Sequence, residues 1–368
     1  MSTRRKNGDG TLEHKPDWPQ AQRRWTAFWG REATDRPLMD VRAPVSPAPL
    51  PLSPPATMEA KYLDADTVVR RWQRTLAATW YGGEAVPTPE FLMGGYALGC
   101  DERVRFVEDT VWHPHMIDSL DAPITWDPGP KDPWRRKLDR VLEALLDAAE
   151  GKFLVGLTCQ VPLNDLIMLL RGTDDFLMDL AEDPAKCARR LVEIFPRHLE
   201  VTEHIERLIG RRQSGCTWGY PGLWHRAPFA IAQSDMSCMI SGALFEQWVL
   251  RELDLIAEHY PFLWYHLDGP RAARHLPTLL GRPYIRCIQY VPGAGAEPNG
   301  PAWMALYRQV QAAGRCLDLA VPPEQVEHLV RHLRPEGLLV RTRVKTREEG
   351  EELLRNAPAW AGSRLGAP

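Results

Sequence analysis

The chain has 368 residues, of which 44% are hydrophobic and 25% charged, values typical of a globular protein with one large domain or two average ones. Its formal net charge of −3 at pH 7 provides no general basic field, which argues against nucleic acid as a partner. Because the sequence lacks apolar runs as long as a membrane span and has seven cysteines without CxxC spacing, we expect a cytoplasmic protein with no membrane partner.

The first predicted elements lie at the N-terminus. Residues 1–17 are polar and contain glycine, and we expect a disordered tail there. Residues 18–29 place tryptophans and a phenylalanine at helical spacing with arginines on the other side, which predicts an amphipathic helix that caps a larger body. We expect residues 18–368 to form a single domain with this helix as an extension.

A strand, a loop and a helix follow. Residues 35–44 predict a turn and a short strand, on which Asp40 and Arg42 share one face. Residues 44–56 are rich in proline, which excludes regular structure and predicts a long loop of the kind that covers a site. Residues 64–79 carry an apolar stripe at helical spacing and predict a helix.

The next hundred residues mix loops with two stronger elements. The glycine-rich stretch 87–100 predicts a strand that runs into a loop, and residues 106–115 predict a hairpin arm. Residues 132–150 predict a helix, and residues 153–160 a buried strand that ends on the polar residue Gln160. A polar residue at a strand tip is a candidate substrate ligand.

From residue 161 onward, helices and strands alternate with short connections. This alternation predicts a parallel sheet covered by helices, and at this length a closed (β/α)₈ TIM barrel is the expected architecture. An open doubly wound sheet is the alternative, although no GxGxxG glycine loop follows a strand. The predicted elements are helices 161–171 and 185–208, strand 229–235, helix 245–259, strands 262–268 and 284–290, helix 302–313, strand 315–319, helix 323–333, strand 338–343 and helix 346–356.

The stretch from Phe262 to Gly269 carries the strongest indication of a site. It runs through large apolar side chains to His266 and Asp268, and a glycine then ends the extended run. Parallel α/β barrels build their sites from polar residues at such strand tips. Two residues apart on a strand, His266 and Asp268 project to the same face, which suits a metal or an acid/base pair. The alternative is a histidine that only hydrogen-bonds Asp268 where the strand ends.

Four stretches, taken in order, carry a family resemblance. They are Gly172–Pro184 with its acidic-proline break, Ser234–Phe245, His266–Gly269, and Pro335–Leu338 leading to Thr342 and Val344. Together they resemble the uroporphyrinogen decarboxylase superfamily, which also holds the corrinoid-linked methyltransferases. The resemblance covers most of residues 18–356, and it implies a TIM barrel with its site at the carboxyl ends of the strands.

The chain departs from that superfamily at the positions of the metal ligands. The zinc methyltransferases have the motif His-x-Cys-Gly and a second cysteine after the last strand. Here Asp268 stands at the first cysteine position and Val344 at the second, so the soft ligands that would hold a thiol substrate are lost. A zinc site of His266, Asp268 and a third group, either Asp235 or Cys316, is one hypothesis.

The first functional hypothesis is methyl transfer from a small O- or N-methylated compound to a corrinoid carried by a partner protein. His266 and Asp268 would bind zinc or supply acid catalysis, while Asp235 and Gln233 would orient the polar end of the substrate. A protonated or metal-bound leaving atom lets the methyl group depart more easily. The lost cysteines favour oxygen or nitrogen as that atom.

The second hypothesis is a metal-independent decarboxylase or other lyase that acts on a carboxylated substrate. Asp40 or Asp235 would stabilise a protonated intermediate, and Arg42 and Arg343 would clamp the carboxylate. A salt bridge from these arginines to Asp40 is the structural alternative. The arginine-rich N-terminal signature of the decarboxylases is not reproduced, since only Arg36 and Arg42 lie in the comparable region.

The third hypothesis is a non-catalytic ligand-binding barrel. The lost cysteines favour it, whereas many ionisable groups at one barrel mouth are costly to retain without a use. The catalytic candidates are His266, Asp235 and Asp268, and the first and last of these are also the metal candidates. The candidate substrate-binding residues are Asp40, Arg42, Gln160, Gln233, Gln289 and Arg343.

Overall fold

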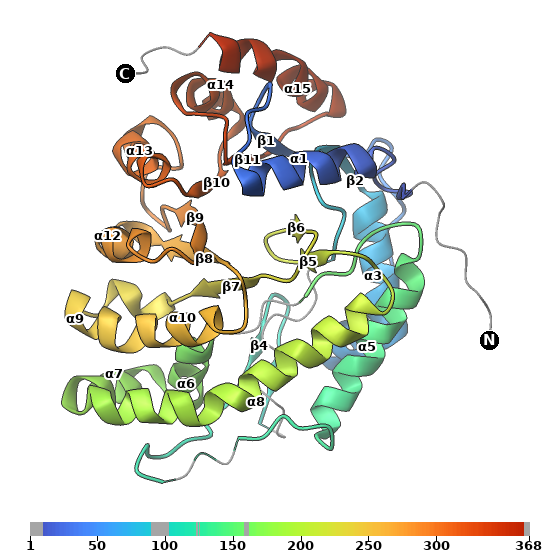
Figure 1. Cartoon of the computed structure of the whole chain (residues 1–368). Helices are drawn as coiled ribbons and strands as arrows, with labels where there is room; N and C mark the ends of the chain where they lie inside the picture. The colour runs from blue at the N-terminus through green and yellow to red at the C-terminus, as the bar shows by residue number, and fades with distance from the viewer. Residues whose placement is uncertain (1–9, 90–102, 123, 125, 158–161, 364–368) are drawn as a thin grey trace.

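The computed structural model describes residues 10–89, 103–122, 124, 126–157 and 162–363, and its architecture is mixed α/β (Figure 1). A seven-stranded sheet in the order β2-β1-β11-β10-β9-β8-β7 forms the centre, and every neighbouring pair is parallel except β1 and β2. The strands are β1 Leu38–Pro44, β2 Thr79–Gly83, β7 Ala230–Gln233, β8 Leu263–Asp268, β9 Ile285–Val291, β10 Cys316–Ala320 and β11 Leu338–Arg343. The predicted parallel sheet is therefore confirmed.

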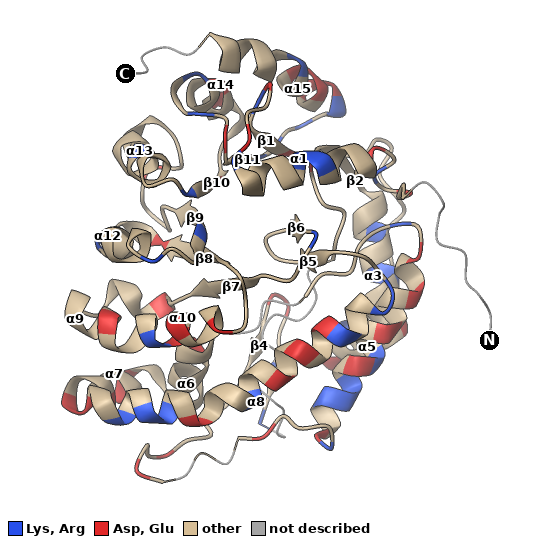
Figure 2. Ribbon diagram, viewed as in Figure 1, with Lys and Arg blue, Asp and Glu red and all other residues tan. Residues whose placement is uncertain are grey.

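Helices cover the outer face of this sheet, as the alternating pattern predicts. Figure 1 shows α10, α12, α13 and α14 outside the strands β7 to β11. Along α5 and α8, Figure 2 shows acidic and basic residues interspersed, so neither charge sign gathers on these two helices. The later helices are α9 Gly242–Leu244, α10 Leu250–Ala257, α11 Gly269–Ala272, α12 Leu276–Leu280, α13 Met304–Ala312, α14 Pro323–His332 and α15 Arg347–Gly362. The earlier helices are α1 Trp18–Gly30, α2 Met58–Leu63, α3 Ala65–Ala77, α5 Pro133–Ala149, α6 Leu163–Arg171, α7 Thr173–Glu182 and α8 Pro184–Gly210.

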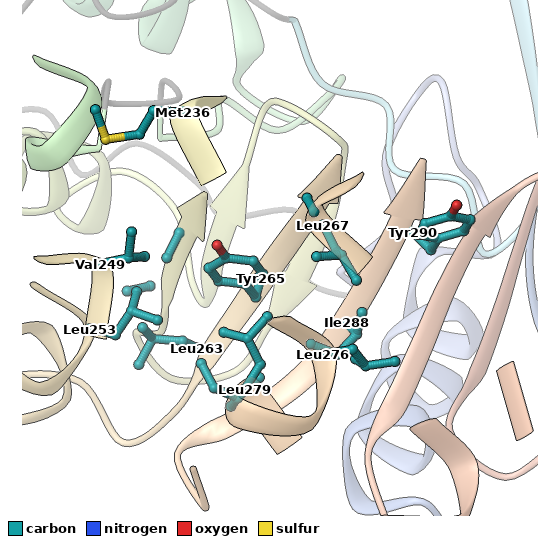
Figure 3. Packing of buried hydrophobic residues seen from close by; sticks show 14 of the residues in the cluster. Met236, Val249, Leu253, Leu263, Tyr265, Leu267, Leu276, Leu279, Ile288 and Tyr290 are labelled. Carbon is teal, nitrogen blue, oxygen red and sulfur yellow. The ribbon is translucent and has the colours of Figure 1, made fainter. Parts of the chain in front are cut away.

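The two faces of the sheet belong to two separate hydrophobic cores, because successive side chains of a strand point to opposite faces. On β8, Tyr265 and Leu267 belong to the outer core between sheet and helices, where Figure 3 shows them with Val249 and Leu253. The intervening Trp264 belongs to the inner core. Strands that are buried on both faces read as nearly continuous apolar runs, and that is the pattern of this stretch.

Helix α1 packs into the inner core at the N-terminal ends of the strands, as expected for a capping helix. Trp29 is 3% exposed, and its indole N–H donates to the backbone oxygen of Trp224 at 2.8 Å. The backbone oxygen of Trp29 accepts from Arg286 at 3.0 Å, and that of Phe28 accepts from the Cys316 thiol at 3.3 Å. These contacts fix α1 against β9 and β10, so the inner core is covered at this end.

The prediction of a strand at residues 153–160 is wrong for residues 153–157, the part that the structure describes. Residues 153–157 form no strand and make only an isolated parallel bridge between Leu157 and Trp218. The reason is the side-chain amide of Gln213, which accepts from the backbone N–H of Val155 at 3.0 Å and donates to its carbonyl. It therefore occupies the groups that a neighbouring strand would bind. Residues 158–161 lie outside the described residues.

Within the described residues, the ladder of seven strands has two ends, β2 and β7. Irregular segments lie between these ends and are joined by hydrogen bonds. Leu154 donates to the Pro87 carbonyl at 2.9 Å, Leu157 to the Thr217 carbonyl at 2.6 Å, and the Trp218 indole to the Phe229 carbonyl at 3.1 Å. A short hairpin, β5 Cys216–Trp218 and β6 Leu223–His225, lies among them.

Other local predictions have mixed outcomes. The proline-rich stretch has no helix or strand over residues 45–57, and the hairpin arm is formed by β3 Arg105–Phe106 and β4 Val111–Trp112. Most of the glycine-rich stretch, residues 90–102, lies outside the described residues, as do residues 1–9 of the predicted tail. Residues 10–17 lie against the body, where Glu13 and His14 donate to backbone oxygens at residues 151 and 152. In the described part of the chain, every helix is too short or too polar to cross a membrane.

The contacts of α1 predict that Trp29→Ala costs about 3–5 kcal/mol of unfolding free energy, because it empties a buried aromatic site and removes an indole hydrogen bond. Trp112→Ala is the matched control, since Trp112 is 58% exposed and its loss should cost less than about 1 kcal/mol. Urea unfolding of both variants checks this. Equal losses would show that α1 does not stabilise the inner core.

Candidate functional site

Polar side chains gather on the inner face of the sheet at the carboxyl ends of the strands. Each polar residue comes two positions after an apolar residue of the inner core on the same strand, so the two side chains point to the same face. The pairs are Leu38 and Asp40, Ile231 and Gln233, Trp264 and His266, Cys287 and Gln289, Cys316 and Asp318, and Leu339 and Arg341. The register places His266 beside Gln233 and Gln289, and Arg42 beside Arg343. Gln160 lies outside the described residues.

The side of β1, β10 and β11 is an arginine–carboxylate network. Arg341, 8% exposed, donates through Nε and Nη2 to Asp318 at 2.8 and 3.1 Å, and through Nη1 to Asp40 at 2.8 Å. Arg42 binds both oxygens of Asp40 at 2.8 Å. Burial opposes ionisation of Asp40, but the guanidinium groups of Arg42 and Arg341 outweigh it and lower its pKa below the ordinary value.

This network decides which arginine is open to a ligand. Arg42 makes the salt bridge to Asp40 that the sequence left as an alternative to a carboxylate clamp. Arg343 is exposed and makes no ion pair with any residue that the structure describes. Of the two arginines expected to hold a substrate carboxylate, Arg343 is therefore the one with a guanidinium available.

The side of β8 and β9 holds His266 in one orientation. Its Nδ1 is hydrogen-bonded to the side-chain oxygen of Gln289, which is 3% exposed, and its ring stacks on Trp264 with centroids 6.2 Å apart. With an amide oxygen on Nδ1, this nitrogen carries the proton, and Nε2 of the neutral ring keeps its lone pair. The alternative predicted from the sequence, a hydrogen bond from His266 to Asp268, is therefore wrong, because the partner of Nδ1 is Gln289.

Asp235 begins a 3₁₀ turn directly after β7, and its carboxyl opens to solvent at the strand ends. Its Oδ1 accepts from Nε2 of Gln233 at 2.9 Å. Loss of hydration at the carboxyl and the nearby charge of Asp268 raise the pKa of Asp235, while His266 opposes the rise. A raised pKa favours the protonated carboxyl, which is the form that can donate a proton to a ligand at the strand ends.

Two buried acids behind Asp235 were not predicted from the sequence. Asp165 on α6 accepts the backbone N–H of Asp235, and burial together with the charge of Asp235 raises its pKa well above the ordinary value. Glu252 on α10 accepts the backbone N–H groups of Leu163 at 2.6 Å and of Asn164 at 2.8 Å, and burial raises its pKa to about 7. Asp165 is the single acid of the largely apolar helix α6, and this is a signal that could have found it, whereas α10 carries Asp254 as well as Glu252 and gives no such signal.

The side chains present do not fit a zinc site. Zinc needs at least three protein ligands, and the described residues contain no group of three His, Cys, Asp or Glu side chains that could hold a metal. Cys316 is the first residue of β10, at the opposite end of the sheet from His266, and its thiol donates to Phe28. Val344 is 7% exposed and belongs to the outer core. No step of the reaction is therefore derived through a metal.

Comparison with known proteins adds no name to this geometry. No protein-family model matches the chain, and no curated protein matches it. The resemblance to the uroporphyrinogen decarboxylase superfamily therefore stays a prediction.

The arginine network predicts opposite outcomes for two neighbouring arginines on β11. Arg341→Met leaves Asp318 and one side of Asp40 buried without a cation, which should cost about 3–5 kcal/mol of stability. Arg343→Met, two residues further along the same face, removes an exposed charge and should cost less than about 1 kcal/mol. Guanidinium unfolding of both variants measures the difference. If Arg341→Met loses less than about 1 kcal/mol of unfolding free energy, the arginine network does not stabilise the sheet.

Glu252 predicts a pH dependence of stability. A carboxyl whose pKa is raised by folding holds its proton more tightly in the folded state. Its contribution is fully present below pH 4.5, the value of the free group, and is lost as the pH rises to about 7. The loss amounts to about 3 kcal/mol. Unfolding free energies between pH 5 and 8 should fall less steeply in Glu252→Gln than in the wild type. The exposed Glu258→Gln serves as the control and should keep the wild-type slope.

Proposed function

We propose that the chain is a (β/α)₈ barrel enzyme that acts on a small molecule at the carboxyl ends of its strands. The hydrogen bonds that join the irregular segments between β2 and β7 support closure of the barrel. The observation that carries the enzymatic assignment is Asp235, an acid with a raised pKa that is open to solvent and interacts with His266 and Asp268. Such a group is suited to protonating a leaving atom.

The proposed reaction is methyl transfer from an O- or N-methylated compound to a corrinoid carried by a partner protein. The acceptor supplies the electron pair of the new bond to the methyl carbon. The electron pair of the old C–O or C–N bond stays on oxygen or nitrogen, which takes the proton of Asp235. Gln233 donates to the resulting carboxylate, and the nearby His266 favours the ionised form of Asp235.

Two further features support this proposal. Asp268 and Val344 stand where the resembled zinc methyltransferases have the thiolate ligands that activate a sulfur leaving group, which favours oxygen or nitrogen. Cys287 and Cys316 are register partners on β9 and β10, and both are free thiols. Two neighbouring cysteines that form no disulfide fit the reducing, cytoplasmic setting that we propose.

Arg343 favours a second candidate, decarboxylation without a metal. Its exposed guanidinium beside the Arg42–Asp40 pair could bind a substrate carboxylate. In that reaction the electron pair of the broken C–C bond stays on carbon, which takes the proton of Asp235 while CO₂ leaves. Both candidates share the acid, and they differ in their need for an acceptor.

One assay separates these functions. A panel of O-methylated, N-methylated and carboxylated small molecules is incubated with the protein, with and without free cob(I)alamin as the acceptor. Methyl transfer predicts a change in the cobalamin absorption spectrum that depends on the methylated compound. Release of CO₂ without cobalamin would contradict methyl transfer and support decarboxylation. Binding of a compound without turnover would indicate a non-catalytic barrel.

The acid role of Asp235 predicts that Asp235→Asn lowers the turnover rate about 10²- to 10⁴-fold while the thermal midpoint stays within a few degrees. His266→Ala should also lose activity without a large loss of stability, since it lies at a strand tip. The exposed Asp66→Asn on α3 is the matched control and should keep the full rate. Full activity in Asp235→Asn would overturn the proposed mechanism.

A further inference from the structure

Asp165 is a buried acid with an unusual set of partners. It is 1% exposed, and its two oxygens accept the backbone N–H of Asp235 at 3.0 and 3.2 Å. Its remaining hydrogen bond among the described residues comes from Nε2 of Gln233 at 3.4 Å. No cation of the described chain pairs with it, and a buried carboxylate without a cation is costly.

The side-chain amide of Gln233 joins this buried acid to the exposed one. Its Nε2 lies 2.9 Å from Oδ1 of Asp235 and 3.4 Å from Oδ2 of Asp165. An NH₂ group carries two hydrogens, so one amide can donate to both carboxyls. The backbone oxygen of Gln233 in turn accepts from Asn164, the residue before Asp165, at 3.1 Å. The end of β7 and the start of α6 are therefore held together at this point.

The charged groups around the two acids are mostly acidic. His266 and Asp268 on β8 face Asp235, and Glu252 on α10 and the hydroxyl of Tyr265 on β8 face Asp165. The side chains of Arg274 and His275 reach the turn after Asp235, but they bind its backbone oxygens. Those oxygens belong to Ser237, Cys238 and Ile240. Burial and neighbouring acids accordingly raise the pKa values of both Asp165 and Asp235.

We propose that Asp165 is a positioning residue for Asp235: its buried carboxyl fixes the backbone of Asp235 and the amide of Gln233, and thereby the direction in which Asp235 presents its proton. This inference rests on the proposed acid role of Asp235. Asp165 is enclosed and holds this geometry, while Asp235 is exposed and exchanges its proton with substrate and solvent. The two carboxyls thus have separate tasks, which follow from one being enclosed and the other open.

The test measures the titration of each carboxyl by NMR on the full chain labelled with ¹³C at aspartate side-chain carboxyls, without substrate. Signals of the two residues are assigned from Asp165→Asn and Asp235→Asn. Asp165→Asn mimics the neutral acid and should leave the midpoint of Asp235 within about half a pH unit. Asp165→Ala lets water in and frees Gln233, so the midpoint of Asp235 should fall by about one unit or more.

A second measurement covers the case in which Asp165→Ala does not fold. In Asp235→Asn the charge next to Asp165 is gone, so the midpoint of Asp165 should move down from its wild-type value. Asp66→Ala is the control and should leave both midpoints unchanged.

Three results would overturn the proposal. The first is a titration midpoint of Asp165 near its ordinary value in the wild type, and the second is a midpoint of Asp235 that stays unchanged in Asp165→Ala. The third is a midpoint of Asp235 that falls as far in Asp165→Asn as in Asp165→Ala. The last would indicate a charge effect instead of positioning. These results are independent of turnover, so failure of the methyl-transfer assay and failure of this inference can be told apart.

Discussion

The buried guanidinium of Arg341 is the constraint on which the inner face of the sheet depends. It lies between Asp40 on β1 and Asp318 on β10, and the Trp264 indole of β8 donates to the same Asp318 at 3.1 Å. Removing these charges from water costs free energy that only complete pairing offsets. The geometry supplies that pairing, since Arg341 donates to both carboxylates and to the backbone oxygen of Pro221 at 2.8 Å. Four strands are thereby tied at one level, just below the open end of the sheet.

Arg341 and Arg42 pair with the carboxylates of β1 and β10, whereas the acids near the end of β7 have no arginine partner among the described residues. Asp235, Asp165 and Glu252 have neutral or histidine partners instead of guanidinium groups. A carboxyl in such surroundings lowers its free energy by keeping a proton, and this explains the direction of all three pKa values. The arginine–carboxylate ion pairs therefore lie beside β1 and β11, and the carboxyls with raised pKa values lie near β7 and β8.

The sequence predicts the strands and their faces well because the period-two pattern is local. The placement of His266 and Gln289 on one face follows from counting along each strand, whereas their hydrogen bond depends on which strands are neighbours, and no local pattern encodes that. The strand expected at 153–160 failed for a similar reason, since the amide of Gln213 comes from a distant segment. Asp165 and Glu252 were missed because an acid in a helix is usually solvated. Here both are buried by tertiary contacts, Asp165 against the backbone of Asp235 and Glu252 against the start of α6.

If the proposed methyl transfer holds, the geometry also constrains how the methyl donor lies in this site. In a direct displacement, the acceptor, the methyl carbon and the leaving atom are in line, so the acid must contact the leaving atom on the side away from the acceptor. Asp235 is anchored from behind by Asp165 and Gln233, and its free side faces the open ends of the strands. The leaving atom would therefore sit deepest, against Asp235, with the methyl group directed outward. A large acceptor carried by another protein could reach it there without entering the sheet, whereas a decarboxylase needs no such outward orientation of its reacting bond.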